Sequence, residues 1–293
     1  MRRLLLITGI TGLTGRFLYK EIQGSPHIGR IRYLVRRTSD TSWMHPNEDI
    51  VYGDLRNSAS IQEAFYGVTT VLHLAPRGAL KTILDVCKNN NFIRIFYVNS
   101  TGIYSKFKKS SHVDNINEKL LDNSGFVYTI IRPTMIYGNQ QDGNIHLLVK
   151  GMKKTPIYPI IGDGEGLMHP IYARDLAKVL ICCLNNPKTT EFKKYNVAGK
   201  APIEYQDLLK EIASALKKKV YFIRIPYSIA LFIGRIGDLI PNRIINYEKV
   251  LRIKEDKAFD FSDAANDLGF NPISFQEGIK LEIDDLKRAK IIK

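Results

Sequence analysis

Cysteine is scarce in this 293-residue chain, which contains three: Cys87, Cys182 and Cys183. Three thiols cannot build the disulfide framework that holds small secreted domains together. Cys182 and Cys183 stand side by side in an apolar run, so we expect buried thiols, a reducing compartment and a cytoplasmic location. With 44% apolar and 25% charged residues, the composition is that of a globular protein with one large domain or two unequal lobes.

Long hydrophobic runs are also absent. No stretch approaches the roughly 18 consecutive apolar residues of a transmembrane helix, so we expect no membrane span. The apolar start Leu4–Ile7 is broken by Thr8 and Gly9, and we expect no signal peptide. Two common catalytic patterns are missing too. The six histidines contain no pair at metal-ligand spacing, so we expect no metal site. No Gly-x-Ser-x-Gly sequence is present, which excludes the nucleophile elbow of the α/β-hydrolases.

Acidic residues are outnumbered, because 29 Asp and Glu face 43 Lys and Arg, for a net charge of +14. Such an excess favours anionic partners: nucleotides, nucleic acids or an acidic membrane surface. The basic residues are scattered, however, and their densest groups are Lys106–Lys109 and Lys217–Lys219. Arginines interleaved with aromatic residues, as on RNA-binding surfaces, are absent. We therefore expect a solvated, lysine-rich surface and no nucleic-acid partner.

The first half of the chain alternates short apolar runs with amphipathic segments. The runs are nearly continuous and contain many β-branched residues, which is typical of strands buried on both faces of a parallel sheet. Strands separated by helices imply right-handed crossovers. We therefore predict an α/β fold with a Rossmann-like, doubly wound parallel sheet. The predicted strands are Leu4–Thr8, Ile31–Arg36, Ile50–Tyr52, Thr70–Leu74, Ile93–Asn99 and Tyr128–Arg132; the predicted helices are Gly15–Gln23, Ser60–Phe65, Leu80–Asn89 and a segment that includes Glu118–Asn123.

The strongest motif is the loop Thr8–Gly15, which follows a predicted strand and opens a predicted helix. Gly9 allows a tight turn, Gly12 lets a pyrophosphate approach the backbone, and Gly15 lets the helix pack on the strand. The free amides at the helix start then face the phosphates. We expect the loop to bind a dinucleotide, through Gly9, Thr11, Gly12, Leu13, Thr14 and Gly15.

Two arginines, Arg36 and Arg37, follow the second strand, where NAD-specific proteins place an Asp or Glu on the ribose hydroxyl. A guanidinium can hold a 2′-phosphate with two hydrogen bonds, whereas a carboxylate would repel it. The pair therefore predicts NADP as the cofactor, with NAD as the alternative. The alternative is that the two arginines have no function and simply belong to the surface of a basic protein.

The second half of the chain consists of separated pieces that predict a smaller C-terminal substrate lobe. We assign residues 1–145 and 170–200 to a dinucleotide-binding domain, and residues 146–169 and 201–293 to the lobe. The apolar stretch Ile229–Ile240 contains Arg235 and Asp238, so we interpret it as a helix of the lobe or of an interface. The other predicted elements are helices at Ala173–Leu184, Gln206–Leu216, Ile244–Arg252 and Ser262–Leu268, with strands at Lys194–Val197 and Val220–Arg224.

Several segments match motifs of one family. They are Thr8–Gly15 (TGxxGxxG), Gly53–Leu55 (GDL), Leu74–Pro76 (HLAA), Val98–Tyr104 (VSSxxVYG), Ile131–Gly138 (RPxxxYG), Ile161–Gly166 with Pro170–Asp175 (GDG…PVxVxD), Tyr195–Gly199, Phe259–Ala264 and Leu268–Phe270. On these residues the chain resembles, over nearly its whole length, the extended or atypical branch of the short-chain dehydrogenase/reductase superfamily. Within this superfamily it is most similar to the NAD(P)-dependent epimerase/dehydratase family of sugar-nucleotide enzymes.

The resemblance implies the residues that contact the cofactor. In the family, the acid of the GDL segment and the amide after it hold the adenine, the HLAA stretch lies beside the ribose, and the RPxxxYG run closes over the nicotinamide. The matching positions in this chain are Asp54, Leu55, Leu74, Ala75, Pro76, Ser100, Pro133, Thr134 and Met135.

The catalytic motif of the family does not stand where the resemblance places it. The family uses Tyr-x-x-x-Lys on the helix after the serine strand, where the tyrosine moves the proton and the lysine lowers its pKa. With the register set by Glu118–Leu121, the tyrosine position is Ser110 and the lysine position is Asp114. Tyr104 and Lys108 have the right spacing but precede the helix. As an enzyme, the chain would bind the substrate oxygen with Ser100 and Thr101, and would use Tyr104 as the acid with support from Lys108.

A second departure concerns the substrate. Many family members bind the substrate diphosphate with an arginine seven residues before the last Asp of PVxVxD, and that position is Met168 here. A nucleotide-sugar substrate is therefore in doubt. The candidate substrate-binding residues are Tyr137, His169, Tyr172 and Arg174; packing is the alternative for His169 and Tyr172, and a charge at a helix start is the alternative for Arg174.

Two functions of different class remain open at this point. The first is an NAD(P)-dependent oxidoreductase or epimerase/dehydratase that acts on a sugar, a sugar nucleotide or a related carbonyl compound. The second is an NAD(P)-binding regulatory or structural protein without turnover, which the missing Tyr/Lys pair favours. The apparently complete substrate lobe favours the enzyme. The partner is a small-molecule substrate in the first case, and a homodimer is left open in both.

Overall fold

Seven parallel strands form the central sheet of the protein, for which a computed structural model describes residues 4–25, 28–75, 77–88, 93–239 and 246–292. From edge to edge, the strand order is β11-β6-β5-β4-β1-β2-β3. The chain begins in the middle of the sheet and winds outwards in both directions, which confirms the predicted doubly wound, Rossmann-like fold. The strands are β1 (Leu4–Thr8), β2 (Arg30–Val35), β3 (Asp49–Tyr52), β4 (Thr70–His73), β5 (Arg94–Val98), β6 (Val127–Pro133) and β11 (Lys193–Val197).

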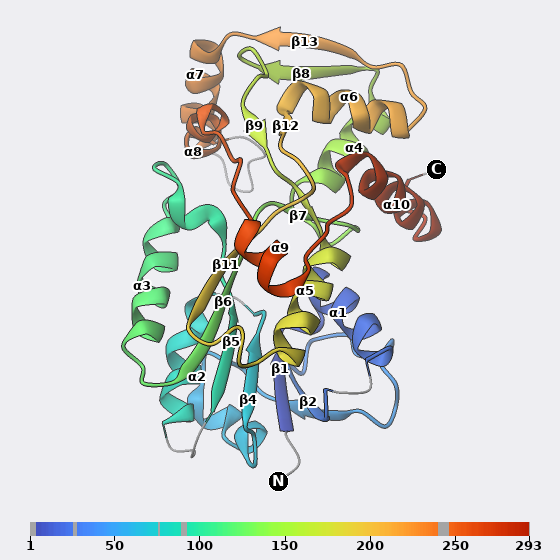
Figure 1. Cartoon of the computed structure of the whole chain (residues 1–293). Coiled ribbons are helices and arrows are strands. Elements are labelled where there is room, and N and C mark those ends of the chain that lie inside the picture. Colours follow the sequence, from blue (N-terminus) through green and yellow to red (C-terminus); the bar gives the residue numbers. More distant parts are fainter. Residues whose placement is uncertain (1–3, 26–27, 76, 89–92, 240–245, 293) are drawn as a thin grey trace.

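Helices cover both faces of this sheet (Figure 1). Neighbouring side chains of a strand point to opposite faces, so Phe96 of β5 belongs to one hydrophobic core and Tyr97 to the other. Because both faces are buried, the strands contain nearly continuous apolar runs, and all five residues of β1 are buried. The covering helices are α1 (Leu13–Gln23), α5 (Ala173–Asn185) and α9 (Ser262–Leu268) on one face, with α2 (Leu80–Cys87) and α3 (Ser111–Asp122) on the other.

A smaller lobe lies beyond the carboxyl ends of the strands, at the top of Figure 1. Its separate core includes Val149, Leu209 and Ile283 from three helices that pack beside a two-stranded ribbon. Within the described ranges, no helix is long and apolar enough to cross a membrane. The lobe contains α4 (Ile145–Lys154), α6 (Tyr205–Ala215), α7 (Tyr227–Gly237), α8 (Tyr247–Leu251), α10 (Phe275–Arg288), the ribbon of β8 (Ile157–Ile161) with β13 (Tyr221–Ile225), and the short pairs β7 (Ile136–Tyr137) with β10 (Ile171–Tyr172) and β9 (Leu167–Met168) with β12 (Ile203–Glu204).

Two local expectations differ from the structure, and a third lies partly outside the described residues. Helices α4 and α10 are not among the elements predicted from the sequence, although α10 begins with a capping box between Ser274 and Glu277 that is a helix-start signal. The segment Ser60–Phe65, predicted as one helix, consists of two short 3₁₀ turns that begin at Ser58. The predicted helix Ile244–Arg252 starts outside the described residues, and its described part contains α8. The proposed domain boundaries stay a prediction.

Glu282 of α10 is an acid in the core of the lobe. It is fully buried, and its carboxyl group faces the carboxylate of Asp142. Asp142 is also buried, and its carboxylate accepts hydrogen bonds from the backbone amides of Asn144 and His146. Burial first, and then the negative charge of Asp142, raise the pKa of Glu282 to about 10. Glu282 therefore keeps its proton at neutral pH.

Replacing Glu282 with Gln should stabilise the protein at neutral and alkaline pH. An acid whose pKa is higher in the folded state holds a proton that the unfolded chain has released, so stability falls as the pH rises from about 4.5 towards about 10. Glutamine keeps the shape and does not titrate. In thermal unfolding, the variant should have the higher Tm at about pH 8, and the two proteins should converge towards about pH 5. A Tm difference that is independent of pH would contradict the assignment.

Candidate functional site

The loop between β1 and α1 needs two of its glycines for the fold itself. Gly9 has a φ of +84°, and a Cβ there would lie 2.7 Å from the backbone nitrogen of Ala75. A Cβ at Gly15 would overlap the carbonyl of Ile10. A Cβ at Gly12 would meet only the Gly9 oxygen, at 3.4 Å. Packing therefore does not require a glycine at position 12. The absence of a side chain there leaves space above the loop.

The start of α1 is prepared for an anion. Gly12 is the N-cap residue and offers no side-chain cap, and the first turn contains no acidic residue. The first backbone N–H groups of the helix thus have no side-chain acceptor, while the helix dipole favours a negative group at this end. This arrangement can bind a pyrophosphate. Thr11, Leu13 and Thr14 stand in the same loop, and the amide of Gln141 donates to the Thr11 carbonyl at 3.3 Å.

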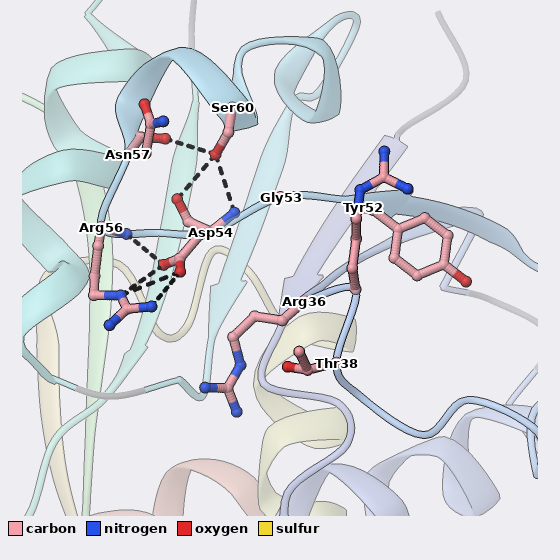
Figure 2. A pocket seen from close by; sticks show the side chains of 9 residues that line it. Arg36, Thr38, Tyr52, Gly53, Asp54, Arg56, Asn57 and Ser60 are labelled. Atoms are coloured by element: carbon pink, nitrogen blue, oxygen red, sulfur yellow. Dashed lines mark hydrogen bonds and ion pairs between the residues drawn. The ribbon is translucent and has the colours of Figure 1, made fainter.

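A hollow of about 570 Å³ lies at the carboxyl ends of β2 and β3, and Figure 2 shows its lining side chains. Asp54 in this hollow is held by Arg56, whose Nη2 lies 2.6 Å from Oδ2. The hydrogen bonds from Arg56 are the main cause that lowers the pKa of Asp54 to about 2. Arg37 lies over the ring of Tyr52 at 5.7 Å. The lining consists of Arg36, Arg37, Thr38, Tyr52, Gly53, Asp54, Arg56, Asn57 and Ser60.

Arg36 differs from the other two arginines of this hollow. Within the described structure no hydrogen-bond or ion-pair partner is found for its side chain, and its guanidinium extends between Thr38 and the Asp54–Arg56 pair (Figure 2). Arg56 already neutralises the Asp54 carboxylate at short range. The hollow therefore presents two cations without a carboxylate of their own, Arg36 and the stacked Arg37, to an incoming group. Arg36 and Asp54 are predicted from the sequence; Arg56 is not, although the Asp54-x-Arg56 spacing could have indicated it.

The other predicted cofactor residues lie at the same edge of the sheet, because the carboxyl ends of parallel strands meet there. Leu74 follows β4 and donates its N–H to the Thr8 carbonyl at 3.0 Å. Thr134 follows β6, and its hydroxyl donates to the carbonyl of His169. Leu55, Ala75, Pro133 and Met135 stand beside these residues in the chain, and Pro76 lies outside the described residues. Contact of these residues with a cofactor stays a prediction.

Ser100 and Thr101 follow β5 and have different surroundings. The Ser100 hydroxyl accepts a hydrogen bond from the backbone N–H of Gly102 at 2.9 Å, so its own proton can go to another acceptor. Thr101 is buried, and its hydroxyl donates to the Pro133 carbonyl at 3.3 Å. The geometry therefore favours Ser100 over Thr101 as a group that meets a substrate.

Tyr104 lies beside an ion pair that the sequence analysis does not identify. Its hydroxyl accepts a hydrogen bond from Arg132 Nη1 at 2.7 Å and donates to Asn196 Oδ1 at 3.2 Å. Arg132 also donates from Nε to Glu118 Oε1 at 2.7 Å. The ring of Tyr104 stacks on Phe259 and is half exposed. The phenol is thus accessible and is hydrogen-bonded to a cation.

Lys108 meets a different partner. Its ammonium lies 3.0 Å from Oδ2 of Asp114, which is fully buried in the first turn of α3. A Cβ at Gly102 would overlap the end of the Lys108 side chain. Ser110 immediately precedes α3. No described contact therefore joins Tyr104 to Lys108, although their spacing matches the family motif.

A carboxylate from the lobe holds the turn between these two residues. Glu255 accepts hydrogen bonds from the Ser105 hydroxyl at 2.7 Å, from the Lys106 N–H at 2.7 Å and from the Phe107 N–H at 3.2 Å. These residues lie about 150 positions apart, so no local pattern could reveal the contact. These three hydrogen bonds, called the Glu255 clamp below, fix the course of the chain immediately after Tyr104.

The four candidate substrate residues all have partners within the protein. Tyr137 and Tyr172 are buried in the core of the lobe. His169 is buried, its Nε2 lies 2.8 Å from the Gly199 carbonyl, and burial lowers its pKa. Arg174 pairs with Glu21 at 2.6 Å. Packing and pairing account for these side chains, and their contact with a substrate stays a prediction. In the described ranges, no cluster of His, Cys, Asp or Glu could hold a metal ion.

The fold and the loop geometry define a Rossmann-type dinucleotide-binding protein. Comparison with known families makes this assignment specific, because the model of the NAD(P)H-binding family matches residues 9–187. The chain belongs to this NAD(P)H-binding family. The resemblance to the epimerase/dehydratase branch of the short-chain dehydrogenase/reductases is confirmed, and NAD(P) is the cofactor.

Known proteins of similar fold include sugar-nucleotide enzymes. The crystal structure of UDP-glucuronic acid 4-epimerase from Bacillus cereus, in complex with UDP-glucuronic acid and NAD, is 17% identical with a TM-score of 0.77, and the match covers 98% of this chain and 99% of that one. N-acetyl-alpha-D-glucosaminyl-diphospho-ditrans,octacis-undecaprenol 4-epimerase of Escherichia coli O157:H7 is 20% identical, over 64% of this chain and 67% of that protein.

A further relative is longer than this chain. The 3beta-hydroxysteroid-dehydrogenase/decarboxylase isoform 2 of Arabidopsis thaliana is 22% identical over 288 residues, which cover 80% of this chain. The match covers 51% of that protein, so the chain spans about half of its length. Together, the relatives define an epimerase/dehydratase-like fold and leave the substrate open.

Replacing Gly12 with Val should abolish cofactor binding and leave the fold intact. The side chain fills the space above the loop, where packing does not need a glycine. Calorimetric titration with NADPH and with NADH should detect no binding, while the Tm stays near that of the wild type.

Gly15→Ala is the matched control. Its methyl group overlaps the Ile10 carbonyl, so this variant should lose thermal stability as well as binding. Wild-type cofactor affinity in Gly12→Val would contradict the placement of the pyrophosphate.

Proposed function

We propose that the chain is an NADP(H)-dependent oxidoreductase that acts on a carbonyl group of a sugar or a related small molecule. The observation that carries the cofactor preference is the unpaired Arg36 in the hollow at the ends of β2 and β3. Supplementary support comes from the sugar-nucleotide enzymes among proteins of the same fold. When bound, the nicotinamide cofactor supplies or accepts the hydride.

Four features of the hollow support a 2′-phosphate. Arg36 can form two charge-assisted hydrogen bonds to it, and the Thr38 hydroxyl lies beside the same space (Figure 2). An unpaired Asp54 carboxylate would repel a phosphate, but Arg56 pairs with this carboxylate and neutralises its charge. Arg37 is directed over Tyr52 and provides positive charge at the rim.

Replacing Arg36 with Asp should weaken NADPH binding and spare or improve NADH binding. A charge-assisted bidentate contact contributes about 1.5–3 kcal/mol, so we expect a loss of roughly 10- to 150-fold in NADPH affinity by calorimetry. Lys81→Asp, on the exposed side of α2, makes the same charge change elsewhere and should alter neither affinity. Equal affinity of the wild-type protein for NADPH and NADH would refute the preference.

In the proposed chemistry, Tyr104 donates the proton that the substrate oxygen takes up. Its hydroxyl is half exposed and is held by a hydrogen bond from Arg132, so it is placed to donate its proton to a substrate alkoxide. Ser100 is proposed to donate a hydrogen bond to the same substrate oxygen. Lys108 and Thr101 act less directly: Lys108 compensates Asp114, and Thr101 fixes the Pro133 carbonyl.

Replacing Tyr104 with Phe keeps the ring on Phe259 and removes only the acid. If Tyr104 is the proton donor, kcat should fall by about 10²-fold or more, with NADPH affinity unchanged. The assay is NADPH oxidation across a panel of sugars, UDP-sugars and aldehydes. Tyr66→Phe, at a residue that is 83% exposed, is the matched control. Full activity in Tyr104→Phe would remove the residue from the site.

One observation favours a second function. In α3, Asp114 is buried against Lys108 and Ser110 precedes the helix, so the positions that carry tyrosine and lysine in the family carry neither. The second candidate is therefore an NADP(H)-binding regulatory or structural protein without turnover. In that case the wild-type protein shows no activity on the whole panel, and Tyr104→Phe binds NADPH as the wild type does.

A further inference from the structure

Helix α7 (Tyr227–Gly237) packs on the lobe through its smallest residues. Its buried positions are Ala230, Gly234 and Gly237, which are spaced as one stripe of a helix. A Cβ at Gly234 would lie 3.1 Å from the backbone of Tyr247 in α8. The close contact between α7 and α8 therefore depends on small side chains, and the bulky residues of α7 cannot be its packing face.

The bulky apolar residues of α7 face solvent instead. Ile229, Phe232, Ile233 and Ile236 follow the i, i+3, i+4, i+7 spacing of one helix face and are all exposed. Leu239 follows the helix and is 84% exposed, and Phe232 is 66% exposed. A helix of a soluble protein normally has the opposite arrangement. This contiguous face, Ile229–Leu239, has no partner within the described structure.

The neighbouring ribbon adds to this surface. Tyr221 and Ile223 of β13 are exposed and lie on one side of the ribbon, since side chains two residues apart share a face. Tyr221 pairs in register with Ile157 of β8, which is also exposed. Pro226 connects β13 directly to α7, and Figure 1 shows both elements at the end of the molecule opposite the N-terminus.

The same part of the chain holds much of the positive charge. From Lys217 to Lys254 there are nine basic residues, and only Asp238 and Glu248 are acidic, so this segment accounts for half of the net charge of +14. Arg235 of α7 is exposed and lies over Tyr247 at 5.1 Å. Lys254 lies over Tyr227, at the start of α7, at 4.3 Å. Cations thus lie near both ends of the helix.

We propose that the apolar face of α7, with the adjoining β8–β13 ribbon, docks on the surface of an anionic lipid bilayer. A bilayer surface offers hydrocarbon to the exposed side chains and phosphate groups to the cations of the surrounding segment. With 11 residues, α7 is too short to span a bilayer and would lie in the interface plane. A second copy of the chain fits less well, because joining two such faces brings two strongly basic segments together.

Vesicle co-sedimentation of the full chain tests this proposal. The wild type should bind vesicles of equimolar phosphatidylglycerol and phosphatidylcholine, and should bind pure phosphatidylcholine vesicles weakly or not at all. Added salt should reduce the binding. The double variant Phe232→Ser/Leu239→Ser should bind the anionic vesicles at least about tenfold more weakly. Tyr66→Ser removes an exposed aromatic side chain far from α7 in the sequence, and should bind as the wild type does.

Two further measurements distinguish membrane docking from loss of the fold and from self-association. NADPH affinity should be the same in all three proteins, which shows that the fold and the cofactor site are intact whether or not the proposed oxidoreductase activity exists. Absence of wild-type binding to anionic vesicles, or unchanged binding by the double variant, would overturn the proposal. Sedimentation equilibrium tests whether a second copy of the chain occupies the face. If the wild type is a dimer, the double variant is a monomer and neither binds vesicles, the face serves self-association instead.

Discussion

The contact between Gly15 and the carbonyl of Ile10 is the constraint on which the site depends. Any side chain at Gly15 would overlap that oxygen, so only glycine lets α1 start directly above the end of β1. The first N–H groups of α1 therefore point over the edge of the sheet where β1, β4, β5 and β6 end. The uncapped helix start, the arginine hollow and the segments after β4 and β6 all lie along this edge of the sheet. Packing does not require a glycine at Gly12. Space for the pyrophosphate of the cofactor explains why this position lacks a side chain.

Around this edge, two ion pairs lie near the positions where the resemblance to the epimerase/dehydratases places a catalytic tyrosine and lysine. Lys108 compensates buried Asp114, and Arg132 joins Tyr104 to Glu118. Both pairs bring a cation close to the residues that follow β5, yet each cation has its own carboxylate. The proposed oxidoreductase therefore depends on the Tyr104 hydroxyl, which is accessible beside Arg132. The Glu255 clamp on the following turn fixes the position of Tyr104 relative to the lobe.

The fold could be read from the sequence because its signals are local. Buried parallel strands give continuous apolar runs, and the glycine spacing of Thr8–Gly15 marks the first crossover. The site could be read only in part. The contacts of Tyr104 with Arg132 and Asn196 join residues 28 and 92 positions apart, and no periodicity carries that information. The sequence also did not reveal that α7 packs through its small residues and exposes its large ones. Its sequence is that of an ordinary apolar helix, and the tertiary contact of Gly234 with Tyr247 shows which side is buried.

The most direct test of the account is a crystal structure of the protein with NADPH bound. We expect the pyrophosphate over Gly12 at the start of α1, the 2′-phosphate within hydrogen-bond distance of Arg36, and the nicotinamide on the side of the sheet edge that Ser100 borders. The hydroxyl of Tyr104 should then face the C4 atom of the nicotinamide across a space that admits a carbonyl group. A 2′-phosphate that points to solvent, away from Arg36, or a pyrophosphate that does not contact the loop between β1 and α1, would contradict the account.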